Sequence, residues 1–144
     1  AELVQAAQAL IADETDTIAN MANLSALIWQ FVPRLNWAGF YRLIDGELVL
    51  GPFIGKPACI RIPVGKGVCG AAAASGEIQL VADVHAFPGH IACDAESRSE
   101  LVVPVRRDGK VIAVIDLDSP EPARFDAIDA MGIKALAMAI AHAI

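Results

Sequence analysis

Apolar residues recur with helical spacing near both ends of the chain. Between Thr17 and Val32, apolar or small residues occur at Ile18, Met21, Ala22, Ser25, Ile28, Trp29 and Val32. This spacing places them on one face of an α-helix, and Pro33 would end that helix because proline has no amide hydrogen to donate. From Arg124 onward a similar face is formed by Phe125, Ile128, Gly132, Leu136 and Ala139. The pattern therefore predicts helices near both termini.

Two central segments instead alternate apolar and polar residues around Asp-Gly pairs. In residues 37–53, two strand-like runs flank Asp45-Gly46, which is a strong signal for a β-hairpin. The period of two places Trp37 and Tyr41 on one face of the first strand. Residues 100–118 repeat this arrangement around Asp108-Gly109. Hairpins rather than strand-helix-strand units predict an antiparallel sheet covered by terminal helices, an α+β fold.

Residues 51–94 show neither helical spacing nor strand alternation of apolar residues. They contain all three cysteines, two of the three histidines and seven of the eleven glycines. This density favours a site built from loops. Within the segment, "VCGAAAASG" predicts one short helix with Gly76 just past its end.

Three acidic side chains are expected to lie together on the second hairpin. Asp116 and Asp118 share one face of their strand, and a period of two puts Ile112 and Val114 on the same face. A two-residue turn would place Glu100 opposite Leu117, pointing away from both aspartates. We therefore expect a three-residue loop, 107–109, which brings Glu100 opposite Asp116.

Clustered carboxyl groups beside an apolar wall suit a cationic ligand such as an ammonium group. Because they repel one another, one of them is expected to keep a proton near neutral pH and to donate a hydrogen bond. The alternative is a strand end in solvent, with its acids paired to Arg98, Arg106 or Arg107. Trp37 and Tyr41 also have two interpretations, either core packing or a wall around a small apolar group of a ligand.

Length, composition and charge narrow the classes of function. The 144 residues fit a single domain over positions 1–144, and 56% are hydrophobic without a run of the ~18 needed to span a bilayer. A net charge of -6 opposes binding to nucleic acid. "AELVQAAQAL" has no signal-peptide character, which favours a cytoplasmic protein. The apolar composition and the amphipathic terminal helices favour a homodimer.

The cysteines allow several kinds of chemistry. Three is an odd number, which fits reactive, metal-binding or packing thiols better than a closed disulfide framework. A metal site is not expected, because the usual close spacing of ligands is missing among Cys59, Cys69, His85, His90 and Cys93.

Cys93 is a candidate nucleophile. A free thiol needs help to ionise near neutral pH, and His90 or Arg98 is close enough in sequence to supply it. Asp94 would oppose ionisation because its charge disfavours a neighbouring thiolate. The residues alone therefore leave buried packing, metal ligation and nucleophilic attack open for Cys93.

Four segments, "LVLGPFIGKPACIRIPVGKGVCG", "DVHAFPGHIACD", "SELVVPV" and "DLDSP", closely resemble the free methionine-(R)-sulfoxide reductases, which are built on a GAF domain. The resemblance runs along essentially the whole chain. It implies a single GAF-like domain with a central antiparallel sheet of about six strands and with N- and C-terminal helices packed on it. It also implies reduction of free L-methionine-(R)-sulfoxide to methionine.

The resemblance further assigns roles to particular residues. Cys93 attacks the sulfoxide sulfur and becomes a sulfenic acid, and Cys59 resolves that acid as an intramolecular disulfide. Cys69 is assigned an auxiliary resolving or relay role. No bound cofactor is implied, because thioredoxin reopens the disulfide with electrons from NADPH through thioredoxin reductase. Substrate contacts are assigned to Glu100, Asp116, Asp118, Trp37 and Tyr41.

Two rival interpretations remain at this point. A GAF domain that binds a small molecule without turnover would be a sensor, and the absence of an output domain in this sequence favours the enzyme. A structural zinc protein would hold one tightly bound zinc ion per chain.

Overall fold

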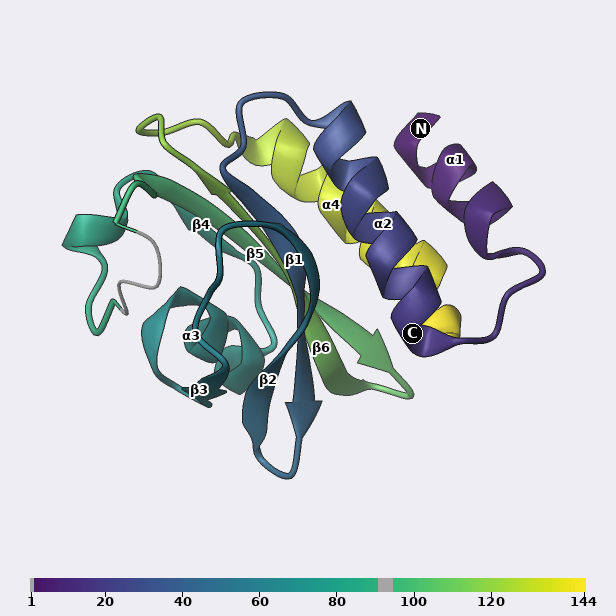
Figure 1. Cartoon of the computed structure of the whole chain (residues 1–144). Helices are drawn as coiled ribbons and strands as arrows, with labels where there is room; N and C mark the ends of the chain where they lie inside the picture. Colours follow the sequence, from purple (N-terminus) through teal and green to yellow (C-terminus); the bar gives the residue numbers. More distant parts are fainter. Residues whose placement is uncertain (1, 91–94) are drawn as a thin grey trace.

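A curved antiparallel sheet forms the centre of the computed structural model, which describes residues 2–90 and 95–144 (Figure 1). Within the described residues the sheet has six strands in the order β3-β2-β1-β6-β5-β4. Their bounds are β1 Trp37–Ile44, β2 Glu47–Gly55, β3 Arg61–Pro63, β4 Gln79–Val81, β5 Ser99–Arg107 and β6 Lys110–Ser119. The predicted α+β sheet of about six strands is thereby confirmed.

The helices divide between the two faces of the sheet (Figure 1). On one face, α2 (Thr17–Phe31) and α4 (Ala127–Ile140) pack on the strands, and α1 (Glu2–Ile11) packs on these two helices. On the other face lies α3 (Gly67–Ser75), in contact with β3, β4, β5 and β6. Two short 3-10 helices, η1 (Val84–Ala86) and η2 (Ala141–Ala143), complete the described elements. No helix among residues 2–90 and 95–144 has both the length and the apolar character to cross a membrane.

Local chemistry explains where the main helices begin and end. The Asp16 carboxylate accepts a hydrogen bond from the Ala19 amide at 2.8 Å and so caps α2. Asp126 and Asp129 form a capping box at the start of α4. Gly76 ends α3 in the left-handed conformation with a φ of 70°, as the sequence predicts.

The predicted apolar faces of the long helices are partly wrong. Met21, Ile28 and Leu136 are buried as expected. However, Ile18 is 61% exposed and Ile128 is 81% exposed. The burial of α2 and α4 is set by which side each helix turns toward the sheet and toward α1, and spacing along one helix does not contain that information.

Both hairpins turn through their Asp-Gly pairs. Asp45 and Gly46 have φ of 49° and 82°, and Asp108 and Gly109 have φ of 54° and 78°. Two successive residues with positive φ are typical of the two-residue type I′ turn. The three-residue loop expected over 107–109 is therefore wrong.

The register of the second hairpin also differs from the prediction, and a β-bulge explains the difference. Arg106 pairs with Val111 but Val105 pairs with Ala113, so Ile112 is an extra residue in β6. Glu100 consequently pairs with Asp118 and not with Asp116. The bulge also turns Ile112 toward the helix-covered cluster, away from the face of the aspartates.

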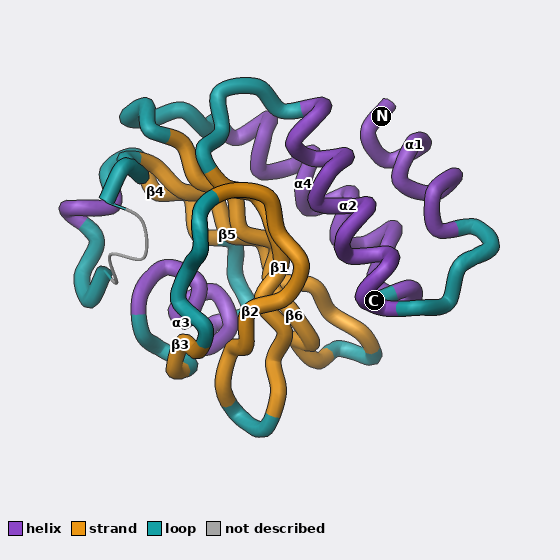
Figure 2. Tube along the Cα trace, in the orientation of Figure 1, coloured by secondary structure: helices purple, strands orange, loops and turns teal. Residues whose placement is uncertain are grey.

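Alternation along β1 gives each face of the sheet its own core. Ala38 and Phe40 belong to the cluster beneath α1, α2 and α4, whereas Trp37 and Tyr41 belong to the cluster beneath α3. This division confirms the prediction that Trp37 and Tyr41 share one face. In Figure 2 the loops gather around α3, so this second face has an irregular cover in which a pocket can form.

Candidate active site

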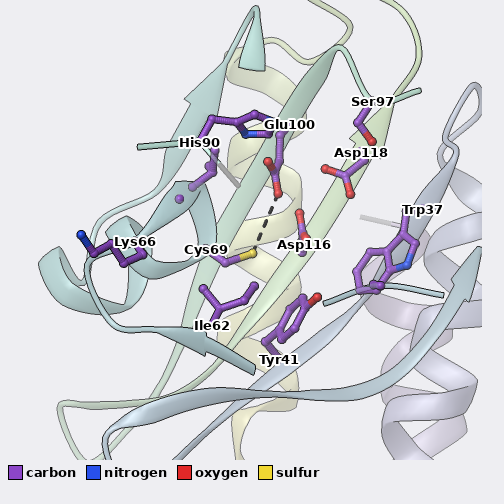
Figure 3. Close-up of a pocket in the computed structure, with 13 residues that line it drawn as sticks. Trp37, Tyr41, Ile62, Lys66, Cys69, His90, Ser97, Glu100, Asp116 and Asp118 are labelled. Carbon is purple, nitrogen blue, oxygen red and sulfur yellow. Dashed lines mark hydrogen bonds between the residues drawn. The ribbon is translucent and has the colours of Figure 1, made fainter. Parts of the chain in front are cut away.

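A pocket lies between α3 and the sheet, on the face that carries Trp37 and Tyr41 (Figure 3). It combines aromatic rings, carboxyl groups and a thiol, drawn from β1, β5, β6 and α3. The lining residues are Trp37, Tyr41, Ala58, Ile62, Lys66, Gly67, Val68, Cys69, His90, Ser97, Glu100, Asp116 and Asp118. The pocket thus brings together six of the eight residues that the sequence analysis selected.

One wall of the pocket is aromatic and held in place. The rings of Trp37 and Tyr41 are stacked with centroids 5.8 Å apart, and Phe53 stacks on Trp37 at 5.1 Å. Trp37 Nε1 donates to the Lys56 carbonyl at 3.2 Å, and the Tyr41 hydroxyl donates to the Cys59 carbonyl at 2.9 Å. Because the polar ends of both rings already have partners, the rings contribute apolar surface to the pocket lining.

The three carboxyl groups lie beside this aromatic wall on the same face of the sheet, and Trp37 pairs directly with Asp118. Glu100 on β5 pairs with Asp118 on β6, and Val102 pairs with Asp116, so all three acids share one face. Each is buried, with exposed fractions of 8% for Glu100, 5% for Asp116 and 9% for Asp118. The register prediction was wrong, yet the gathering of the three acids was right, because a shift of one residue in either direction turns Glu100 to the aspartates' face.

Burial changes the acidity of this trio. It raises the pKa of Glu100 well above its usual range, and the charges of Asp116 and Asp118 raise it further. Burial also raises the pKa of Asp116, although a hydrogen bond with Glu100 opposes that shift. Glu100 is therefore the carboxyl group of this trio that most favours its protonated form, in which it can donate a hydrogen bond.

Two of the three arginines that could have neutralised these acids have other partners. Arg106 donates to the Gly76 carbonyl, and Arg107 donates to the Ile144 carbonyl at 3.0 Å. Asp116 Oδ1 is buried and has no hydrogen-bond partner in the described part of the chain. A buried acceptor without a partner is unusual in a folded protein and indicates a place where a ligand binds.

The cysteines lie in different surroundings. Cys69 in the first turn of α3 is a free, buried thiol whose Sγ lies 3.9 Å from Glu100 Oε2, with the thiol donating. Burial, followed by the nearby acids, raises the pKa of this thiol well above its usual range. Cys59, between β2 and β3, is disulfide-bonded. Cys93 and its neighbour Asp94 lie outside the described residues.

A glycine lets α3 approach the strands closely enough to deliver Cys69. A Cβ at Gly70 would lie 2.6 Å from the Pro63 carbonyl oxygen, which no side chain tolerates. Gly70 is therefore needed where α3 crosses the end of β3.

Several pocket residues were not selected from the sequence. Ser97 accepts a hydrogen bond from Asn36 Nδ2 at 3.0 Å, and Lys66 points its ammonium group away from the acids in Figure 3. His90, which was considered only as a helper of Cys93, lines the pocket, and burial followed by the charge of His85 lowers its pKa. The only signal for Lys66 and His90 was their position in the glycine-rich segment 51–94, which does not show which side chains turn inward, and Ser97 follows that segment without any such signal.

The residues that could hold a metal also differ from those considered in the sequence. Cys69, Glu100 and Asp116 offer one ligand atom each, and these atoms lie within 4.8 Å of one another. The two carboxyl groups come from the β5–β6 hairpin, whereas the thiol comes from α3, earlier in the chain. Spacing of ligands in the sequence could not have revealed this group.

Comparison with known proteins places the chain among characterised relatives. Residues 19–144 match the family described as GAF domain. The free methionine-R-sulfoxide reductase of Escherichia coli is 51% identical over 136 residues, which cover 94% of this chain and 82% of the relative. The enzyme of the same name from Saccharomyces cerevisiae is 44% identical, covering 96% of this chain and 82% of the relative.

A solved structure shows the same architecture. The free methionine-R-sulfoxide reductase of Neisseria meningitidis, in complex with its substrate, superposes with a TM-score of 0.93 at 46% identity. The match covers 97% of this chain and 84% of that one.

Proposed function

This chain belongs to the free methionine-R-sulfoxide reductases, oxidoreductases of the GAF domain family, and we propose that it reduces free L-methionine-(R)-sulfoxide to methionine with its own thiols. The observation that carries the proposal is the pocket beneath α3. It sets a stacked aromatic wall beside three buried carboxyl groups, with Cys69 in its lining and the Cys59 carbonyl bonded to Tyr41.

The pocket suits the two ends of the substrate. The ionised carboxylates attract the ammonium group, and a protonated carboxyl such as Glu100 donates a hydrogen bond to the sulfoxide oxygen. Trp37 and Tyr41 enclose the methyl group on sulfur. A peptide nitrogen carries no charge, so a methionine within a protein would leave buried carboxylates unpaired, and the free amino acid is preferred.

The chemistry takes place in two thiol steps. The Cys93 thiolate attacks the sulfoxide sulfur, oxygen passes to Cys93 as a sulfenic acid, and methionine leaves. The Cys59 thiol then attacks the sulfenic sulfur, which forms a disulfide and releases water. The disulfide-bonded state of Cys59 beside the pocket supports this sequence. Thioredoxin reopens the disulfide with electrons from NADPH, and no cofactor needs to be bound.

Cys69 has an auxiliary resolving or relay role in this scheme. Its high pKa favours the thiol over the nucleophilic thiolate at neutral pH. It therefore acts after Cys59, and only once a disulfide is available for exchange.

The same proposal includes a homodimer in the cytoplasm. The exposed apolar side chains of α4, including Ile128 and Met131, offer a surface that a second copy would cover. A reducing compartment would keep the thiols active between turnovers.

A coupled assay tests the enzyme against the sensor interpretation. The protein is mixed with each sulfoxide stereoisomer, thioredoxin, thioredoxin reductase and NADPH. We expect NADPH consumption with the R isomer of the free amino acid and none with the S isomer. Stoichiometric binding of a nucleotide without NADPH consumption would instead identify a sensor.

Replacing single cysteines tests their order of action. We expect Cys93→Ser to abolish turnover, and Cys59→Ser to release about one methionine per chain before it stalls. Single-turnover methionine release and thiol counting measure both results. Normal turnover by Cys93→Ser would remove Cys93 from the chemistry.

A further inference from the structure

Three ligand atoms of different chemistry converge at the inner end of the pocket. Cys69 Sγ comes from α3, and the Glu100 and Asp116 carboxyl oxygens come from β5 and β6. All three lie within 4.8 Å of one another, and all three side chains are buried. Figure 3 shows them pointing toward a common centre.

This geometry is close to that of a small tetrahedral metal site. With a metal–sulfur bond of about 2.3 Å and metal–oxygen bonds of about 2.1 Å, ligand atoms in a tetrahedron are about 3.5 Å apart. Cys69 Sγ and Glu100 Oε2 are already 3.9 Å apart. Small rotations of the side chains would bring all three atoms to bonding distance.

An independent observation indicates that this place takes a ligand. Asp116 Oδ1 is buried without a hydrogen-bond partner, and its side chain lines the pocket. Asp118 adds a further carboxyl group to the same wall. A divalent cation would supply the missing partner and would neutralise carboxyl groups that otherwise repel one another.

We propose that Cys69, Glu100 and Asp116 form a binding site for a thiophilic divalent cation such as Zn²⁺, and that this cation competes with the amino acid for the pocket. A thiolate with two carboxylates favours zinc or cadmium over magnesium or calcium, because the harder cations bind oxygen ligands almost exclusively. The predicted competition rests on the proposed function, since the cation and the amino acid would both use Glu100 and Asp116. Binding of the cation by itself does not depend on the proposed function.

Binding of the cation releases protons. The thiol of Cys69 and the protonated carboxyl among the acids must both ionise before they coordinate the metal. Affinity therefore increases with pH. The other titratable groups that line the pocket are Tyr41, Lys66, His90 and Asp118, from β1, the start of α3, the loop before residue 91 and β6.

A variant with a single thiol isolates the site. In Cys59→Ser, Cys93→Ser, Cys69 is the only cysteine of the chain, so a thiolate-to-cadmium charge-transfer band can come only from it. We expect one Cd²⁺ per chain by ultraviolet titration, and one Zn²⁺ by calorimetry. Adding Cys69→Ser to this background should abolish the band and weaken Zn²⁺ binding at least tenfold.

Replacing the carboxyl ligands tests the rest of the site. Glu100→Gln and Asp116→Asn, each in the single-thiol background, should weaken Cd²⁺ binding at least tenfold. Asp13→Asn removes the same charge from an exposed turn and should leave the affinity unchanged. Equal affinity in the Glu100, Asp116 and Asp13 variants, or Zn²⁺ binding that survives the loss of Cys69, would overturn the site.

Competition with methionine sulfoxide completes the experiment. We expect the apparent Cd²⁺ affinity to fall as the sulfoxide is added, and Zn²⁺ to raise the KM of the wild-type enzyme. Cation binding by a protein without reductase activity would refute only the proposed function. Reductase activity with no bound cation would refute only the site.

Discussion

At the scale of single residues, burial in the pocket decides the chemistry. Glu100, Asp116 and Asp118 would be ordinary acids on a surface, but beneath α3 they have lost water and face one another. Cys69 is likewise converted from a potential thiolate into a thiol that donates to Glu100. The sequence predicted which acids would meet, whereas the contact of Cys69 with Glu100 required the position of α3.

Asp116 tests whether the acids bind the substrate. Its Oδ1 atom has no hydrogen-bond partner among residues 2–90 and 95–144, so the substrate's ammonium group is the partner that we expect it to gain. Asp116→Asn keeps the shape and removes the charge, and we expect kcat/KM to fall about 10- to 100-fold, as for loss of a charged hydrogen bond. Steady-state kinetics measure this, with Asp13→Asn as the control. An unchanged kcat/KM would remove Asp116 from the binding site.

Glu100 should make the free energy of unfolding depend on pH. Its pKa is raised above the ordinary 4.5, so the folded protein keeps a proton that the unfolded chain releases. The contribution of that proton to the free energy of unfolding is fully present below pH 4.5. It is lost as pH rises toward the raised pKa, at about 1.4 kcal/mol per pH unit.

Glu100→Gln removes this titration while keeping a donor in place. We therefore expect wild type to lose unfolding free energy relative to the variant between pH 5 and pH 7, by about 1–3 kcal/mol. Urea unfolding of both proteins at several pH values provides the measurement. Parallel curves for the two proteins would show that Glu100 does not hold the proton.

At the scale of the elements, close packing and one bulge align the site. The bulge at Ile112 shifts the register of β5 against β6 and sets Glu100 opposite Asp118. A bulge leaves little signal in a run of apolar residues such as "KVIAVI", because each residue there suits either face. Alternation could therefore predict the strands and turns, but not their register.

Gly39 controls how closely β2 approaches β1. A Cβ at this position would lie 2.8 Å from both the Phe53 Cα and the Pro52 carbonyl oxygen, so Gly39→Ala must push β2 away. We expect a loss of about 1–3 kcal/mol of stability, and a higher KM because Phe53 no longer supports Trp37.

Gly132→Ala is the matched control for this prediction. Nothing lies within 4 Å of a Cβ at Gly132, and the residue is inside α4. We expect the free energy of unfolding of this variant to increase by about 0.5–1 kcal/mol, because alanine favours a helix more than glycine does. Chemical unfolding and KM measurements compare the two, and equal stability of both variants would contradict the close approach at Gly39.

At the scale of the whole molecule, several large apolar side chains remain exposed on the surface of the monomer. Ile128 on α4 is 81% exposed and Leu80 on β4 is 46% exposed, at different parts of the surface. If α4 forms the dimer interface, Ile128→Arg should yield monomers in light scattering, because a charge cannot be buried there unpaired. Leu80→Arg should leave the dimer intact, and the reverse pattern would place the interface elsewhere.

The sequence by itself determined the elements and the chemistry available. Period-two alternation and two Asp-Gly turns predicted the hairpins, and long shared strings identified the family. Both are local properties that do not depend on distant contacts. The tertiary structure alone decided which face each helix buries, which way the register shifts at Ile112, and that Cys69 meets Glu100 and Asp116. These features depend on how the elements pack on one another, because side-chain volume and desolvation act only once the elements touch.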